Sequence, residues 1–171
     1  DVEVSTFHSF AKSILEDNVL ESGINISSGV IKRSAQLAWG LKNIDSFNFQ
    51  HVKIGNNVII KPFCEIRDNC KVGNNVSFGS RCTLAADTIV ENHVIIKYGF
   101  VATDTPKVPD SKRTPCKIRE KARFGANVTI MPGTTIGKNS EIGACSQVRK
   151  NVPSNEIWYG NPAKFFKMVK G

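Results

Sequence analysis

Residues 54–101 read IGNNVI IKPFCE IRDNCK VGNNVS FGSRCT LAADTI VENHVI IKYGFV, and residues 118–153 read IREKAR FGANVT IMPGTT IGKNSE IGACSQ VRKNVP. All fourteen of these six-residue units begin with Ile, Val, Leu or Phe. The fifth position holds only Val, Cys, Thr, Ala, Ser or Phe, whereas Gly, Asn, Asp and Lys crowd the second to fourth positions. A fixed period of this kind is the signature of a repeat architecture.

The six-residue period corresponds to one short strand and one turn. The fifth residue of a unit and the first residue of the next are two positions apart, so their side chains point to the same side of an extended chain. The polar positions between them suit a tight turn with positive φ. Because one unit cannot bury its apolar face alone, successive coils must stack. Three units per coil predict a triangular solenoid of four to five coils, whereas the strands of a β-sandwich recur less regularly.

Residues 52–165 resemble the bacterial hexapeptide-repeat transferases. The strongest match is FGANVTIMPGTTIGKNSEIGACSQVRKNVPSNEIWYGNPAKF, in which an IG-A-x-S-x-V-x-K-x-VP run is followed by GNPAK. The resemblance implies a mainly β fold, a left-handed parallel β-helix that assembles as a homotrimer. It also implies an acyl-CoA-dependent O- or N-acetyltransferase that uses acetyl-CoA as co-substrate.

Three regions are expected along the chain. Residues 1–50 lack the repeat and have loosely helical apolar spacing near 6–20 and 30–42, so they are expected to be a partly helical cap. Residues 51–153 form the β-helix, which the proline-rich loop TDTPKVPDSKRTPCK interrupts at 103–117. This loop is either a tolerated surface insertion or, as the resemblance implies, an arm that reaches a neighbouring subunit and walls the active site. Residues 154–171 form a C-terminal extension, and NPAKFFKMVK is predicted to be a short helix.

Composition narrows the class of function. The net charge of +8 arises from the part of the chain that begins at Thr105, which carries 13 Lys/Arg and 4 Asp/Glu. No nucleic-acid motif accompanies these cations, and a polyanionic small ligand explains them equally well. The sequence shows no apolar run long enough to span a membrane and no signal peptide. Five cysteines without metal-ligand spacing predict no metal site and a reducing, cytoplasmic location, with Cys64, Cys70 and Cys82 as small buried side chains.

The resemblance also assigns residues that would contact acetyl-CoA. Small side chains at Ala126 and Ala144 would let the pantetheine arm lie close to the backbone. Arg149, Lys150 and Lys164 would face the phosphates, because charge-assisted hydrogen bonds are about twice as strong as neutral ones. A solvated basic end of the molecule is the alternative interpretation.

The general base is harder to predict. The resemblance places a histidine in or just before the loop, but residues 103–117 contain none, and the nearest comparable positions are Asp104, Thr105 and Lys107. His93 occupies a turn within the repeats beside Glu91 and is a candidate base, so the predicted catalytic residues are His93, Asp104 and Glu91.

Three explanations of the missing loop histidine remain open: His93 serves as the base, an amine acceptor needs no side-chain base, or the activity has been lost. His8 and His51 are further histidines without a supporting pattern. The predicted function is acetyl transfer from acetyl-CoA to a hydroxyl or amine of a saccharide or nucleotide-sugar in bacterial surface polysaccharide biosynthesis. A non-catalytic β-helix scaffold and a serine acetyltransferase-like enzyme, prompted by PCKIRE at 115–120, are the alternatives.

Overall fold

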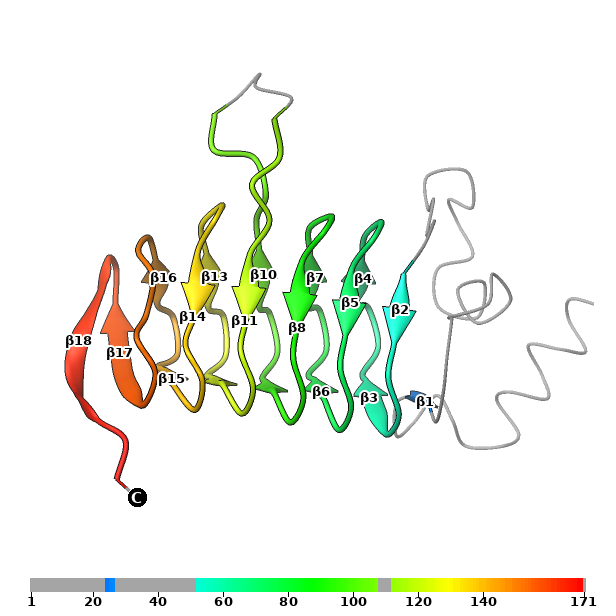
Figure 1. Cartoon of the computed structure of the whole chain (residues 1–171), viewed down its shortest axis with the longest axis horizontal. Helices are drawn as coiled ribbons and strands as arrows, with labels where there is room; N and C mark the ends of the chain where they lie inside the picture. Colours follow the sequence, from blue (N-terminus) through cyan, green and yellow to red (C-terminus); the bar gives the residue numbers. More distant parts are fainter. Residues whose placement is uncertain (1–23, 27–51, 108–111, 171) are drawn as a thin grey trace, which may run out of the picture.

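The computed structural model describes residues 24–26, 52–107 and 112–170 and confirms a mainly β, parallel solenoid (Figure 1). Three sheets form the sides of the prism. Sheet A contains β1 (Ile24–Ile26), β3 (Val58–Ile60), β6 (Ser77–Phe78), β9 (Ile95–Ile96), β12 (Arg123–Phe124), β15 (Glu141–Ile142), β17 (Glu156–Gly160) and β18 (Ala163–Met168). Sheet B contains β2 (Lys53–Ile54), β5 (Lys71–Val72), β8 (Ile89–Val90), β11 (Lys117–Ile118) and β14 (Thr135–Ile136). Sheet C contains β4 (Glu65–Ile66), β7 (Thr83–Leu84), β10 (Val101–Ala102), β13 (Thr129–Ile130) and β16 (Gln147–Val148).

The strands β2–β16 make five complete coils, numbered here from coil 1 (β2–β4) to coil 5 (β14–β16). Val152, bridged to Ile136, and β17 begin a sixth coil. The count is at the upper end of the predicted four to five. The additional unit is the one that carries the loop: it begins at Ala102, leaves the prism, and returns at Cys116 to continue as β11. The left-handed sense of the coil stays an expectation from the family resemblance.

The core of the prism consists of the first and fifth residues of the units. All fourteen predicted first-position residues from Ile54 to Val148, and the fifth-position valines, are buried at 5% exposure or less. Each such aliphatic side chain contributes about 1.5–3 kcal/mol when fully removed from water. Cys70 and Cys82 are buried as predicted, whereas Cys64 is half-buried. The stacking of coils therefore follows directly from the period of the apolar residues.

The turns confirm the expected left-handed backbone conformation. The fourth residue of nearly every unit has positive φ, for example 54° at Asn57, 56° at Asn75 and 60° at His93. Side-chain oxygens link the turns of adjacent coils, because Asn74 Oδ1 accepts the N–H of Asn56 at 2.7 Å and Asn92 Oδ1 accepts the N–H of Asn74 at 2.7 Å. A Cβ at Gly73 would lie 2.5 Å from Asn92 Oδ1, which explains why glycine precedes the asparagines.

The predicted C-terminal helix is wrong. Residues of NPAKFFKMVK form β18, which pairs antiparallel with β17 as a hairpin at the end of sheet A. Gly160, at φ 105°, precedes the Asn161–Pro162 turn, and this tight reversal returns the chain along β17. The apolar spacing of so short a segment fits either a helix or a strand. Hydrogen bonding to the free edge of β17 stabilises the strand.

The N-terminal region is mostly outside the described residues, including the segments 6–20 and 30–42 that were expected to be helical. Residues 24–26 form β1, which pairs antiparallel with β3 at the first coil of sheet A. Among the residues that the structure does describe, none belongs to a helix long and apolar enough to cross a membrane.

Candidate functional site

The turns of the prism gather into three corners. Corner BA leads from sheet B to sheet A, corner AC from sheet A to sheet C, and corner CB from sheet C to sheet B; in coil 1 they hold residues 55–57, 61–63 and 67–69. The loop leaves from corner CB of coil 3 and projects from the prism as an arm (Figure 1). This arrangement decides which of the predicted site residues lie together.

The structure divides the predicted catalytic residues between two corners. Glu91 and His93 lie on corner BA, whereas Asp104 lies on corner CB at the base of the arm. The predicted acetyl-CoA residues are also divided. Ala126 and Ala144 are neighbours on corner AC of coils 4 and 5, Arg149 and Lys150 lie on corner CB of coil 5, and Lys164 lies on β18.

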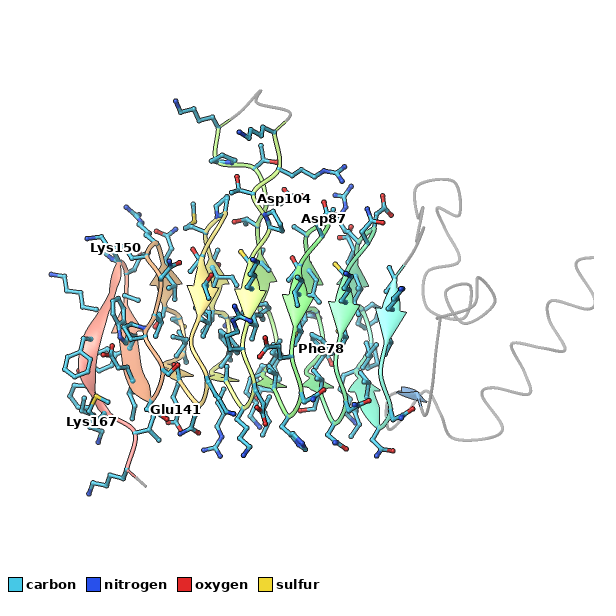
Figure 2. All side chains as sticks on the ribbon, viewed as in Figure 1. Phe78, Asp87, Asp104, Glu141, Lys150 and Lys167 are labelled. Atoms are coloured by element: carbon cyan, nitrogen blue, oxygen red, sulfur yellow. The ribbon has the colours of Figure 1, made fainter. Side chains whose placement is uncertain are left out.

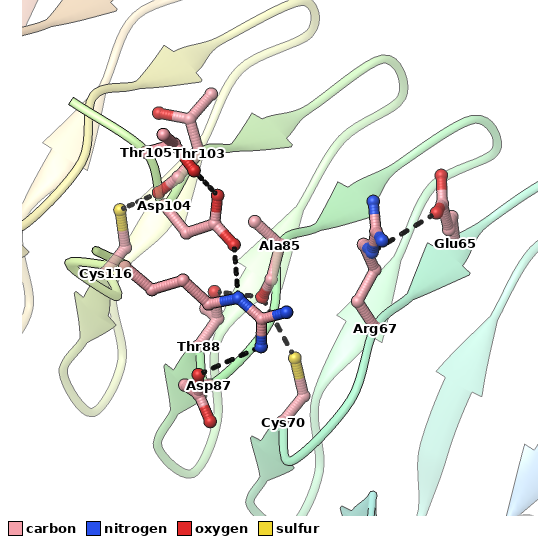
Figure 3. Close-up of polar contacts among 11 residues, drawn as sticks. Glu65, Arg67, Cys70, Ala85, Asp87, Thr88, Thr103, Asp104, Thr105 and Cys116 are labelled. Atoms are coloured by element: carbon pink, nitrogen blue, oxygen red, sulfur yellow. Dashed lines mark hydrogen bonds and ion pairs between the residues drawn. The ribbon is translucent and has the colours of Figure 1, made fainter. Parts of the chain in front are cut away.

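A network of charged and polar groups holds the base of the arm (Figure 3). Asp104 Oδ1 accepts a hydrogen bond from Thr105 Oγ1 at 2.9 Å. Arg113, on the returning limb, lies 3.9 Å from Asp104 Oδ2 through Nε and 3.7 Å from Asp87 Oδ2 through Nη1. The Asp104 side chain is 20% exposed, compared with 36% for Asp87, so its carboxylate is the more enclosed of the two.

Backbone hydrogen bonds join the two limbs of the arm where they meet the prism. The N–H of Thr114 donates to the carbonyl oxygen of Asp104 at 2.5 Å, and the N–H of Gly133 donates to the carbonyl oxygen of Thr114 at 2.7 Å. The hydroxyl of Thr103 donates to the carbonyl oxygen of Ile130 at 2.9 Å. Asp104 is therefore a mostly enclosed carboxylate held in place at the base of the arm by Thr105 and Arg113, and a carboxylate can accept a proton.

Corner BA carries a second group of charges. Glu91 uses both carboxylate oxygens within the protein, since Oε1 pairs with Arg119 Nη1 at 2.6 Å and Oε2 accepts the N–H of Glu120 at 2.9 Å. The Lys138 ammonium lies 2.7 Å from Glu120 Oε2 and lowers the pKa of Glu120, while Glu120 raises the pKa of Lys138. Glu91 is thus a structural acceptor. Its predicted role beside His93 in catalysis is untested.

His93 occupies the turn above these pairs. Its N–H donates to the carbonyl oxygen of Asn74 at 2.9 Å, and its imidazole is exposed. A shallow cavity of about 310 Å³ lies beside it, lined by Lys71, Val72, Gly73, Val90, Glu91, Asn92 and Glu120. No hydrogen bond or ion pair of the imidazole is found within the described ranges of the chain.

The basic residues gather at the C-terminal end of the prism. Arg149 and Lys150 are exposed, and Figure 2 shows Lys150 near this end and Asp104 at the arm. Arg149 donates to Gln147 Oε1, and Lys164 pairs with Tyr159 across the hairpin. The small residues Ala126 and Ala144 are accessible in adjacent turns, where Cys145 N–H donates to the carbonyl oxygen of Ala126 at 2.8 Å.

The buried thiols are not nucleophiles. Burial raises the pKa of Cys70 to about 12 and that of Cys116 to about 11, so both are protonated at neutral pH. The Sγ of Cys116 donates to the carbonyl oxygens of Thr103 and Met131, each at 3.2 Å. In the parts of the chain that the structure describes, no group of three or more His, Cys, Asp and Glu side chains is placed to hold a metal ion.

Sequence reasoning missed Arg113 and Arg119. Arg113 contacts Asp104 only because the arm folds back on itself, and no periodicity marks that contact. Arg119 meets Glu91 across 28 residues because the arm separates two positions that occupy neighbouring coils. The Arg119–Glu91 pair could be predicted from the sequence, since removing the loop places the units that begin at Val90 and Ile118 one coil apart.

Comparison with known proteins identifies the family. Residues 51–86 and 115–150 match the family described as bacterial transferase hexapeptide (six repeats). The chain is 32% identical over 160 residues to WbbJ of Escherichia coli, a candidate lipopolysaccharide biosynthesis O-acetyl transferase, and covers 74% of that protein. The chain belongs to the hexapeptide-repeat transferase family. The alignment with WbbJ covers 90% of this chain.

One further relative and one solved structure show how far the similarity extends. The chain is 37% identical over 128 residues to the galactoside O-acetyltransferase of Lactococcus lactis, covering 60% of this chain and 61% of that protein. It therefore spans about three fifths of the length of that relative. Among solved structures, AntD of Bacillus cereus, an N-acyltransferase solved with a dTDP-linked amino sugar and coenzyme A, superposes with a TM-score of 0.65. The match covers 73% of this chain and 76% of AntD at 22% identity, and it establishes similarity of fold.

Proposed function

We propose that this chain is an acyl-CoA-dependent acetyltransferase that moves an acetyl group from acetyl-CoA to a hydroxyl or amine of a saccharide or nucleotide-sugar in bacterial surface polysaccharide biosynthesis. The observation that carries the proposal is the similarity to WbbJ over nearly the whole chain. The arm at corner CB supports the proposal, because its base holds the mostly enclosed carboxylate of Asp104.

The residues proposed for acetyl-CoA fit its chemistry but occupy two corners of one subunit. Cations on corner CB suit the phosphates, and the small side chains of Ala126 and Ala144 on corner AC suit the narrow pantetheine arm. A cleft between corner CB of one subunit and corner AC of a second copy would bring both sets to one ligand. This requirement favours a homotrimer, the closed symmetric assembly expected for the family.

In such a cleft, Asp104 is the proposed general base. It lies on the same corner as Arg149 and Lys150, two coils nearer the N-terminus, which is where the thioester end of a bound acetyl-CoA would reach. The acceptor oxygen or nitrogen attacks the thioester carbon, its proton passes to the Asp104 carboxylate, and the bond to sulfur breaks to release CoA. His93 lies on corner BA, away from both corners of this cleft.

The alternatives have weaker support. Serine acetyltransferase-like activity would need an aspartate–histidine pair, and within the described ranges the single histidine, His93, has no such partner. A non-catalytic scaffold is favoured only by the absence of a histidine from residues 103–117. Free, mostly buried cysteines support a cytoplasmic location.

An acetyl-transfer assay tests the function directly. Purified protein is mixed with acetyl-CoA and a panel of free saccharides and nucleotide-sugars, and thiol release is measured together with the mass of the acceptor. A gain of one acetyl group on an acceptor, with one CoA released, is expected. Binding of acceptors without any acetyl transfer would favour the scaffold instead.

A further inference from the structure

Corner AC of coils 1 to 3 combines exposed aromatic rings with cations. Phe63 is 71% exposed and Tyr98 is 61% exposed, although large aromatic side chains of this kind are usually covered. Arg81 is exposed in the coil between them. Because adjacent strands lie about 4.8 Å apart, the attachment points of the two rings are about 10 Å apart along the corner, with Arg81 on the coil between them.

This corner is also the one without carboxylates. In coils 1 to 3 it consists of Lys61–Phe63, Gly79–Arg81 and Lys97–Gly99, which contain three cations and no acid. The other two corners of the same coils carry acidic residues, including Asp87 and Glu91. The Arg81 side chain has no ion pair among the described residues, so its charge is available to an anion from outside.

The backbone at Phe63 adds an independent observation. Its φ is 63°, a conformation that glycine and asparagine adopt readily and that is unfavourable for a bulky aromatic residue. Most equivalent turns in this chain place Asn or Gly at this position. A large exposed ring in a strained position stabilises nothing in the core, and such outliers point to a role in binding.

We propose, on the basis of the acetyltransferase function above, that this corner binds the acceptor as a nucleotide-linked sugar. The base stacks on Phe63, the diphosphate pairs with Arg81, and the sugar packs against Tyr98. The order of ring, cation and ring along three coils matches the order of base, diphosphate and sugar in such a molecule. Aromatic stacking accepts any base, and a guanidinium offers paired donors to phosphate.

The orientation agrees with the proposed acetyl-CoA cleft. Tyr98 lies on coil 3, and the next two coils of the same corner present Ala126 and Ala144. The sugar would therefore be the end of the acceptor nearest to the acetyl donor. A second subunit's corner CB would bring its Asp104, also on coil 3, to the same level of the prism.

The test measures binding of UDP to the full chain by calorimetry, without acetyl-CoA, for the wild type and for Arg81→Ala, Phe63→Asn and Tyr98→Ala. Loss of Arg81 or Phe63 is expected to raise the Kd for UDP about tenfold, because each removes one charged or stacking contact. Tyr98→Ala should leave UDP binding unchanged and raise the KM for the nucleotide-sugar. The KM for acetyl-CoA should stay within about twofold in all three variants.

Lys121 provides matched controls. It has the same backbone conformation, φ 61°, and an exposed cation, but it lies on corner BA. Lys121→Ala and Lys121→Asn should leave the Kd for UDP unchanged. Phe63→Asn should also raise the Tm by about 2–4 °C, because asparagine relieves the backbone strain. If the Phe63 ring were needed only for folding, the same substitution would lower the Tm.

The outcomes separate this proposal from the proposed function. If the wild type acetylates a free saccharide but does not bind UDP, the function stands and the acceptor site is wrong. If it binds UDP through Arg81 and Phe63 but transfers no acetyl group, the site stands and the function fails. If the variants raise the KM for acetyl-CoA rather than for the acceptor, the corner is a donor site and the proposal is overturned.

Discussion

Arg113 and Asp104 face each other across the two limbs of the arm, with 3.9 Å between the guanidinium Nε and the carboxylate Oδ2 (Figure 3). The same guanidinium lies 3.7 Å from Asp87 in the preceding coil. One side chain thereby connects the arm, the proposed base and the prism.

Replacing Arg113 by alanine should lower kcat more than it changes the KM for acetyl-CoA. The substitution frees the Asp104 carboxylate to rotate, and misplacement of a base reduces the rate of the chemical step. Arg67→Ala is the control, because Arg67 forms a comparably exposed ion pair with Glu65 elsewhere on corner CB. Equal kinetic effects of the two substitutions would contradict a positioning role for Arg113.

Asp104→Asn should reduce kcat by about 10²–10⁴ because it removes the proton acceptor while preserving shape and the hydrogen bond from Thr105. Steady-state kinetics with saturating acetyl-CoA measure the effect, and the melting temperature checks that the fold is intact. A loss smaller than tenfold would show that Asp104 is not the general base.

His93→Ala should change kcat by less than tenfold. His93 lies on corner BA with an exposed imidazole, whereas Asp104 lies on corner CB. The same assay decides, and a decrease of two decades or more would make His93 the base and require a different cleft.

Joint replacement of Arg149 and Lys150 by alanine should raise the KM for acetyl-CoA about tenfold or more with little effect on kcat, since binding to distant phosphates is the same in the ground state and the transition state. Inhibition constants of CoA and dephospho-CoA, measured for the wild type and the double variant, would show whether these cations bind the 3′-phosphate. An unchanged KM would remove these residues from the donor site.

The buried thiols make the stability of the solenoid sensitive to alkaline pH. The pKa of Cys70 is raised from 9.0 to about 12, so the folded protein keeps a proton that the unfolded chain releases between these values. This contribution is complete below pH 9 and is lost as the pH rises toward 12, at about 1.4 kcal/mol per pH unit. Urea unfolding at pH 8 to 10.5 should show a shallower decline for Cys70→Ala than for the wild type. Parallel curves for the two proteins would refute the burial effect.

The repeat was predictable because its physical cause is local. The alternation within one unit is enough to direct a first-position side chain such as that of Ile60 into the prism. The positive φ at Asn57 follows from the tight turn between two short strands. The hairpin was not predictable from residues 161–170, because its stability depends on the free edge of β17 rather than on the segment itself.

The candidate site was only partly predictable. The family resemblance singled out Asp104 at the loop and Lys150 in the basic region, and their roles stay predictions. No prediction assigned His93 and Asp104 to different corners, although this separation follows from counting units in threes along the uninterrupted repeat from Val90 to Ala102. The sequence did not reveal Arg113 either, whose contact arises only from the conformation of the returning limb.

The β17–β18 hairpin has a consequence for the assembly of whole molecules. A bare last coil would present unpaired backbone groups on which a second solenoid can add end to end, and repetition of that contact would produce filaments. In sheet A, β18 turns the final edge antiparallel to the coils, an irregularity lies at Ile157 and Trp158, and Lys164 and Lys167 line the outer strand. Each of these features opposes the addition of a further strand at the C-terminal edge of sheet A.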